Sequence, residues 1–142
     1  MSAFSEDIKK FNGMYKLPVS TKPSLDVGVP VVERLQAFKN ILAEELDEID
    51  DIVAAAEGQT PDLEVLTMLA DLLGDIQVYC ASEMAKFGLP LDQVLGIIMQ
   101  SNLSKLGADG LPIYDERGKV QKGPNYWKPE PKISALLKAA LE

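Results

Sequence analysis

The pattern of apolar and polar positions is helical along nearly the whole chain. Between Pro30 and Gly58, apolar residues recur at intervals of three and four, the spacing of one face of an α-helix. Pro30 suits a first helical turn and Gly58 suits a helix end, so this segment predicts a long helix. A shorter helix is expected before it over residues 5–14, with Ser5 as its N-cap candidate.

The second half of the chain predicts three further helices and one long loop. Thr60 and Pro61 mark the start of a helix that continues to Gly88 and is apolar almost all round, which predicts that it is buried. A helix over about 91–106 follows, and a last helix over 132–142 ends the chain. The Gly- and Pro-rich stretch between them is unusually long for a loop, and such loops are uncommon in compact domains unless they bind something.

No strand pattern or internal repeat is found, so the fold class is all-α and resembles a four-helix bundle. A short N-terminal helix and a long C-terminal loop plus helix are added to the bundle. With 142 residues, of which 46% are hydrophobic, the chain fits a single domain over 1–142.

Charge is distributed unevenly. Of the 22 acids, 12 lie between Asn40 and Ala85, where no Lys or Arg occurs, and the remainder of the chain has 14 bases against 10 acids. An acidic protein is a poor nucleic-acid binder, so no nucleic-acid partner is expected. A small anionic ligand that carries cations fits this asymmetry better.

Several classes of protein are disfavoured by what the sequence lacks. With no histidine and one cysteine, Ser-His-Asp and Cys-His catalysis and the usual zinc sites are excluded. Carboxylates alone suit Mg²⁺, Mn²⁺ or Ca²⁺. Cys80 is expected to be a small core side chain. We found no apolar run long enough for a bilayer and no signal-peptide core, so no membrane partner and a cytoplasmic location are expected.

The acids of the long helix divide into two groups. At about 100° per residue, Glu45 falls inside the apolar arc and Glu48 on its edge, whereas Asp47, Asp50 and Asp51 point away. On the following helix, acids form one stripe on an apolar cylinder, comprising Glu64, Asp71 and Asp75. The stripe could be an exposed face. Two helices with matched, uncompensated acids instead favour a cation held between them.

These residues resemble a known family. The run "EELDE" at 44–48 fits the E-E-x-x-E motif of the all-α nucleoside triphosphate pyrophosphatase superfamily, which includes the MazG-like and phosphoribosyl-ATP pyrophosphohydrolase-like proteins. "LADLLGDIQVY" is similar to the family's second acidic motif, E-x-x-D, except that Leu72 stands where the family has Glu. "FNGMYKLP" and "SNLSKLGADGLPIYDERGKVQKGPNYWKPE" resemble the opening and tail of a MazG-like subfamily.

The resemblance implies a MazG-type fold and a Mg²⁺-dependent enzyme, for which Mn²⁺ is an alternative metal. Such an enzyme hydrolyses a nucleoside triphosphate or related nucleotide between the α and β phosphates and releases pyrophosphate. It implies that Glu45, Glu48 and Asp75 hold the metal, with Asp71 in place of the missing Glu. Glu44 is implied to share a second metal or to orient the attacking water.

Phosphate binding requires positive charge, and the basic residues follow the acidic helices. Lys105, a candidate for both catalysis and substrate binding, lies one turn after Asn102, and these two match polar positions that the family uses near the phosphates. The loop adds candidate ligands to phosphate, base or sugar, namely Lys119, Lys122, Asn125 and Tyr126, and Gly118 and Gly123 could allow close approach of an anion. Asn12 is a candidate base contact or a simple surface residue.

Two further expectations remain. The chain could instead be a non-catalytic helical module that binds a cation or a partner helix. The helix starting near Thr60 is too apolar to be covered within one small bundle, so a partner subunit is expected, and the resemblance implies a homodimer or homotetramer.

Overall fold

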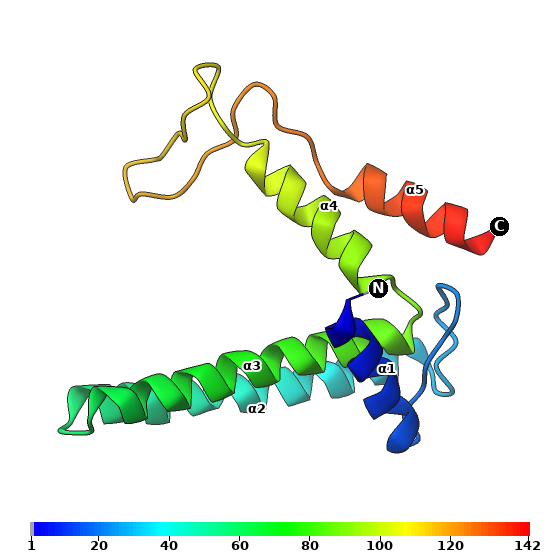
Figure 1. Cartoon of the computed structure of the whole chain (residues 1–142), viewed down its shortest axis with the longest axis horizontal. Helices are drawn as coiled ribbons and strands as arrows, with labels where there is room; N and C mark the ends of the chain where they lie inside the picture. Colours follow the sequence, from blue (N-terminus) through cyan, green and yellow to red (C-terminus); the bar gives the residue numbers. More distant parts are fainter. Residues whose placement is uncertain (1) are drawn as a thin grey trace. The chain divides into compact units, whose positions relative to one another are not determined.

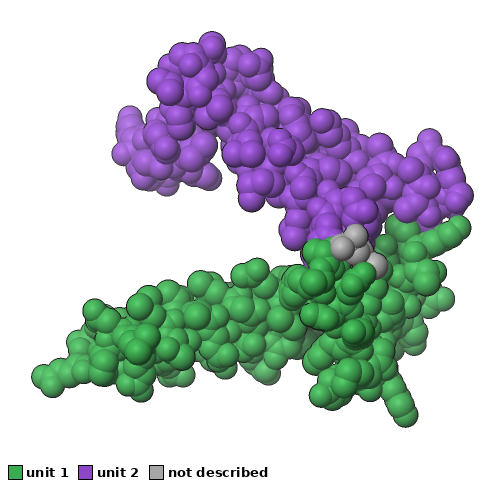
Figure 2. Space-filling model, in the orientation of Figure 1, with its two compact units in different colours: residues 1–88 green, residues 89–142 purple. Residues whose placement is uncertain are grey.

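A computed structural model describes residues 2–142 and divides the chain into two compact units, Met1–Gly88 and Leu89–Glu142 (Figure 2). Unit 1 contains α1 (Ala3–Met14), α2 (Val31–Glu57) and α3 (Asp62–Lys86), and unit 2 contains α4 (Leu91–Leu103) and α5 (Glu130–Leu141). The expectation of a single domain over 1–142 stays a prediction, and its first residue lies outside the described part.

The main feature of unit 1 is a long antiparallel hairpin of α2 and α3 (Figure 1). As expected, α2 ends at Glu57 with Gly58 as its C-cap. The N-cap of α3 is Pro61, one residue after the Thr60 that the sequence suggested. A proline at this position loses nothing, because the amide of an N-terminal residue has no partner inside the helix.

The first helix starts earlier than its sequence signals suggested. Its N-cap is Ser2, whose hydroxyl accepts a hydrogen bond from the Ser5 amide at 3.2 Å, so Ser5 lies inside the helix and is not the cap. α1 packs on α3, and the contact is fixed by Asn12 and Ser82, both buried. The Ser82 hydroxyl donates to Asn12 Oδ1 at 2.6 Å, and Asn12 Nδ2 donates to the Ser82 carbonyl at 3.1 Å.

The irregular segment between α1 and α2 closes the C-terminal end of α3. Carbonyl groups in the last turn of a helix have no partner inside it. Here the amide of Ser20 donates to Ala85 O, the Ser20 hydroxyl donates to Lys86 O, and the amide of Ser24 donates to Phe87 O. Gly88 follows with φ 67°, and a side-chain carbon there would overlap the Lys22 carbonyl, so the turn requires glycine.

A buried ion-pair network joins the start of α2 to the end of α3. Glu83 accepts from Arg34 Nε at 2.9 Å and from Lys86 Nζ at 3.0 Å, and the side chains of Glu83 and Lys86 are 9% and 8% exposed. Arg34 Nη2 is buried with no hydrogen-bond partner among the described residues. Among the described contacts, Glu83 is therefore the only carboxylate that pairs with Arg34 and Lys86, both of which are largely buried.

Much of the apolar surface of α3 is exposed within the chain. By length and composition alone, α3 could cross a membrane, since its best 18-residue window has mean hydropathy 1.2 and is only 17% buried. The sequence analysis had found no apolar run long enough for a bilayer. Core helices of soluble proteins satisfy the same criteria of length and composition. Asp71 and Asp75 lie near the middle of α3, where a carboxylate would be costly in hydrocarbon. A position against other protein surface is therefore more compatible with these two acids on α3 than a position inside a membrane.

In unit 2, α4 ends at Leu103, three residues before the expected end, and α5 begins at Glu130. A long loop joins α4 to α5 (Figure 1). It contains a tight turn around an isolated antiparallel bridge between Tyr114 and Val120. The Asp115 carboxylate accepts from the amides of Arg117 and Lys119, both at 2.9 Å, and thereby shapes this turn.

We predict that Glu83→Gln lowers the free energy of unfolding by about 3–5 kcal/mol, because it leaves Arg34 and Lys86 buried without their counter-ion. Urea denaturation at one protein concentration measures this. The control is Glu57→Gln at the exposed end of α2, expected to change stability by no more than roughly 0.5 kcal/mol. Equal effects of the two substitutions would show that the network contributes nothing.

Candidate functional site

The antiparallel pairing of α2 and α3 gathers the predicted acids. Glu45 is half-buried on α2, and its Oε2 atom is buried with no hydrogen-bond partner among the described residues. Glu48 on α2 and Asp71 and Asp75 on α3 are exposed. The helical positions predicted this difference, because Glu45 falls inside the apolar arc of α2 and Glu48 on its edge.

Glu45 lies within electrostatic reach of Glu48, Asp71 and Asp75. Burial raises the pKa of Glu45 above its ordinary value of 4.5, and the negative charges of Glu48, Asp75 and Asp71 raise it further. A side-chain hydrogen bond with Tyr79 opposes the rise. The structure therefore brings together the four acids for which the sequence predicted a metal-binding role, while that role itself stays a prediction.

Tyr79 is a member of this group that the sequence analysis missed. It lies one turn after Asp75 on α3, and its hydroxyl lies within electrostatic reach of the Glu45 carboxylate. The charge of Glu45 is the main reason that the pKa of Tyr79 is raised. The i, i+4 spacing places Tyr79 on the same face of α3 as Asp75, and this was the available signal. A tyrosine among apolar residues is equally typical of a core position.

The acids form a negatively charged group without a closed coordination cage. Among residues 2–142, no three His, Cys, Asp or Glu side chains converge closely enough to form a ready metal site. Even so, a buried carboxylate oxygen without a donor, beside three more carboxylates, has the chemistry that a hard divalent cation requires. Glu48, Asp71 and Asp75 are exposed and so can change rotamer.

The position that departs from the family motif is a core position in this chain. Leu72 is 2% exposed and is among the most buried side chains of unit 1. An apolar residue is favoured there because a carboxylate would be taken out of water. Asp71, its neighbour, is exposed and acts electrostatically on Glu45, which fits its predicted place in the acidic group.

The other acids of the "EELDE" region are exposed on α2. They comprise Glu44, Asp47, Asp50 and Asp51. The three aspartates form the solvated face that the helical positions predicted. Glu44 is free to reach a ligand from the surface, and its catalytic role stays a prediction.

Asn12 is neither a surface residue nor an accessible base contact. It is 0% exposed, and its amide donates to the Pro18 and Ser82 carbonyls while its oxygen accepts from the Ser82 hydroxyl. A buried amide needs such partners, and here they hold α1 against α3. This corrects the sequence expectation, which could not foresee the packing partner 70 residues away.

In unit 2, the loop folds back and brings three predicted substrate-binding residues together. The Lys122 Nζ atom lies 5.0 Å and the Lys105 Nζ atom 5.9 Å from the centroid of the Tyr126 ring. We call these three residues the Lys105–Tyr126 cluster. The other candidates, Asn102, Lys119 and Asn125, are exposed in the same unit, and no described side-chain contact joins them to the cluster.

Gly123 is needed for the fold of the loop itself. Its amide donates to the Lys105 carbonyl at 2.9 Å, and a side-chain carbon at this position would overlap the Leu106 carbonyl. Gly123 therefore allows close approach of the backbone at Leu106. The sequence analysis had expected it to allow close approach of an anion. Gly118 has φ 79° and open space around it, which is the requirement of a turn.

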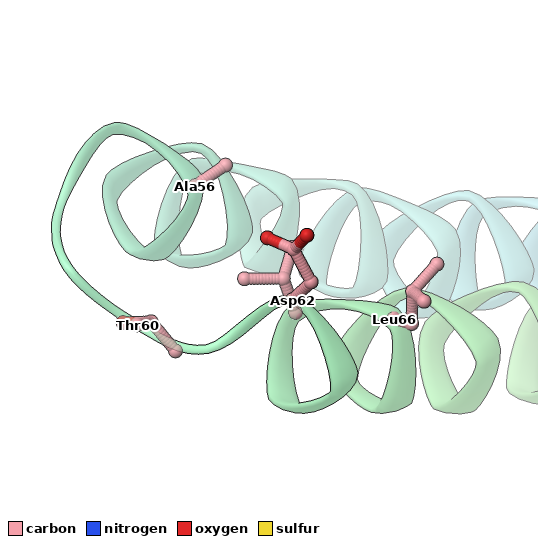
Figure 3. Close-up of a pocket in the computed structure, with 5 residues that line it drawn as sticks. Ala56, Thr60, Asp62 and Leu66 are labelled. Carbon is pink, nitrogen blue, oxygen red and sulfur yellow. The ribbon is translucent and has the colours of Figure 1, made fainter.

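Two other features of unit 1 contribute no chemistry. Burial raises the pKa of the half-buried Cys80 thiol, which makes it a poor nucleophile. A shallow pocket at the α2–α3 turn is lined by Ala56, Thr60, Asp62, Val65 and Leu66 (Figure 3). It lies eleven residues along α2 from Glu45, or about 17 Å of helix, so it is separate from the acidic group.

Comparison with known proteins supports the fold. No family model and no curated protein matches the chain. Among solved structures, it is similar to a protein from Exiguobacterium sp. 255-15 described as a "putative NTP pyrophosphohydrolase". The two chains are 21% identical, the match covers 99% of this chain and 96% of that one, and the TM-score is 0.54. The predicted all-α fold is thus confirmed.

We predict that Glu45→Gln stabilises the metal-free protein at neutral pH. An acid whose pKa is raised by folding binds its proton more tightly in the folded state, so its contribution to stability falls as the pH rises from the unfolded to the folded pKa. Above that window the full penalty is present, and well below pH 4.5 it is absent. Thermal melting in EDTA from pH 4 to pH 8 should show a gain for Glu45→Gln that grows with pH.

Asp47→Asn, on the exposed face of α2, is the control and should show no such pH-dependent gain. A gain for Glu45→Gln that is absent at every pH, or equal to that of Asp47→Asn, would contradict the crowding of Glu45 by its neighbours.

Proposed function

We propose that this protein is a Mg²⁺-dependent nucleoside triphosphate pyrophosphohydrolase, which cleaves its substrate between the α and β phosphates and releases a monophosphate and pyrophosphate. The observation that carries the proposal is the partnerless, buried oxygen of Glu45 among three further carboxylates. The shared fold supports it, since the similar protein from Exiguobacterium is itself described as a "putative NTP pyrophosphohydrolase".

In this proposal Glu45, Glu48 and Asp75 hold the cation, and Asp71 completes the set from the position before Leu72. Glu45 contributes a buried oxygen, and Tyr79 lies within electrostatic reach of it, while the exposed acids can adjust their rotamers. Mg²⁺, when bound, supplies neutralisation of phosphate charge and activation of water. Glu44, exposed beside Glu45, would share a second metal or orient the attacking water.

The phosphates need positive charge as well, because a triphosphate repels a nucleophile and its leaving group gains charge. Unit 2 offers Lys105 and Lys122 beside Tyr126, and the described ion pairs include neither lysine. Asn102, Lys119 and Asn125 remain candidate contacts to the substrate.

The test of the reaction is to incubate the protein with a panel of nucleoside triphosphates and Mg²⁺ or Mn²⁺ and to measure pyrophosphate and monophosphate. We expect Glu45→Gln and Glu48→Gln to lower turnover at least roughly 100-fold, a loss typical when one electrostatic contact to the reacting centre is removed. Both should also lose the rise in melting temperature that Mg²⁺ gives the parent protein.

Asp47→Asn and Asp50→Asn remove the same charge from the exposed face of α2 and should retain activity and the Mg²⁺ effect. Release of inorganic phosphate would indicate a different bond. No turnover with any nucleotide, together with equal Mg²⁺ stabilisation in all variants, would favour the non-catalytic helical module.

We also propose that the protein is a homodimer or homotetramer in which partner subunits cover the hairpin of unit 1. Leu63, Leu66 and Leu73 on α3 are 76%, 60% and 50% exposed, and Val32, Leu35 and Leu46 on α2 are at least half exposed. A single chain with so much exposed apolar surface along one hairpin is expected to associate.

We predict that sedimentation at micromolar concentration shows no stable monomer. Leu66→Glu should shift the equilibrium toward smaller species, because it places a charge on the apolar face of α3. Leu111→Glu, at an exposed apolar site in the loop of unit 2, is the control and should leave the distribution unchanged. A monomeric parent protein would contradict the proposed assembly.

A further inference from the structure

The backbone of Trp127 is held on both sides by serines of unit 2. Ser101, in the last turn of α4, is 2% exposed, and its hydroxyl donates to the Trp127 carbonyl at 2.8 Å. The Ser104 hydroxyl accepts from the Trp127 amide at 3.3 Å and donates to the Ser101 carbonyl at 2.6 Å. We call this arrangement the serine clamp. It joins the returning loop to the end of α4 across more than 20 residues of chain.

The clamp is adjacent to the Lys105–Tyr126 cluster. Tyr126 immediately precedes the clamped residue, and its amide donates to the Gly123 carbonyl in a turn. The Gly123 amide in turn donates to the Lys105 carbonyl. These backbone contacts hold the chain around Tyr126 beside Lys105, which lies two residues after the end of α4. The side chains of Lys105 and Lys122 both reach the Tyr126 ring.

The cluster concentrates two positive charges at one aromatic ring. Two ammonium groups near one aromatic ring repel each other, and the described ion pairs give neither of them a carboxylate. A chain of phosphate groups could contact both lysines at once. The Tyr126 hydroxyl adds a donor for a phosphate oxygen.

We propose that Ser101 and Ser104 are positioning residues that hold Lys105, Lys122 and Tyr126 as a subsite for a polyphosphate chain. Neither serine need touch the ligand. They act through their hydrogen bonds to the backbone of Trp127. The Trp127 side chain is held separately by a cation–π contact, in which Lys132 Nζ lies 3.7 Å from the ring centroid. That the polyphosphate is the tail of a nucleotide rests on the proposed function.

The test uses inorganic tripolyphosphate, nucleoside triphosphate and nucleoside monophosphate as separate probes, with binding measured by calorimetry in EDTA. We expect the two probes that carry a triphosphate to bind and the monophosphate to bind more weakly. Ser101→Ala should weaken tripolyphosphate binding about three- to tenfold, the equivalent of one net hydrogen bond, and Ser101→Thr should restore it. Lys122→Gln should also weaken binding, by removing one of the two charges.

Trp127 is the only tryptophan in the chain, so its fluorescence reports on the clamp directly. Ser101→Ala and Ser104→Ala should shift the emission to longer wavelength before any ligand is added. Ser134→Ala, an exposed serine on α5, is the control and should change neither emission nor binding. Thermal melting of each variant distinguishes a loosened loop from an unfolded unit, and Ser104→Ala provides the test if Ser101→Ala fails to fold.

Tripolyphosphate binding that is the same in the parent, Ser101→Ala and Lys122→Gln proteins would overturn the subsite, and so would a parent that does not bind it. The proposed reaction is tested separately. Glu45→Gln should lose turnover yet bind tripolyphosphate in EDTA as the parent does, so loss of one property without the other shows which proposal has failed.

Discussion

The pairing of α2 with α3 is the constraint on which unit 1 depends. Two helices of 27 and 25 residues lie antiparallel and must bury a shared face. Because Glu45 occupies an apolar position of α2, packing takes one of its oxygens out of water although no base lies on either helix between Asn40 and Ala85. In the proposed function, a bound cation balances this charge. This imbalance is the physical basis of the proposed metal site.

Positive charge is present in unit 1, but it is used elsewhere. Arg34 and Lys86, at the start of α2 and the end of α3, share the buried carboxylate of Glu83. At the same end of the hairpin, Asn12 binds the backbone of α3, and the serines of the segment before α2 cap the last carbonyls of α3. The hairpin is therefore fixed firmly at one end by paired polar groups. The described ion pairs include none of the acids in its middle, and its other end is a simple turn.

Unit 2 is organised by a different principle. Its helices are short, and its long loop is ordered by polar contacts from the backbone, including the Asp115 turn, the Gly123 contact and the serine clamp on Trp127. Apolar burial contributes less here, since Val94 is the one buried hydrophobic residue of the described part of this unit. A loop held in this way places side chains accurately while leaving them accessible, which suits recognition of a small anion.

The sequence by itself determined the helices and the sorting of acids on α2, because both follow from the 3.6-residue period of one local element. It separated Glu45 and Glu48 from Asp47, Asp50 and Asp51, and the helical periodicity without any strand pattern indicated the all-α fold. Helix starts were less well predicted, since caps depend on single hydrogen bonds such as that of Ser2. Only the tertiary structure decided the roles of Asn12, Leu72, Tyr79 and Gly123. Each depends on a partner outside its own local pattern, and the residue spacing along one helix or loop contains no information about what packs against it.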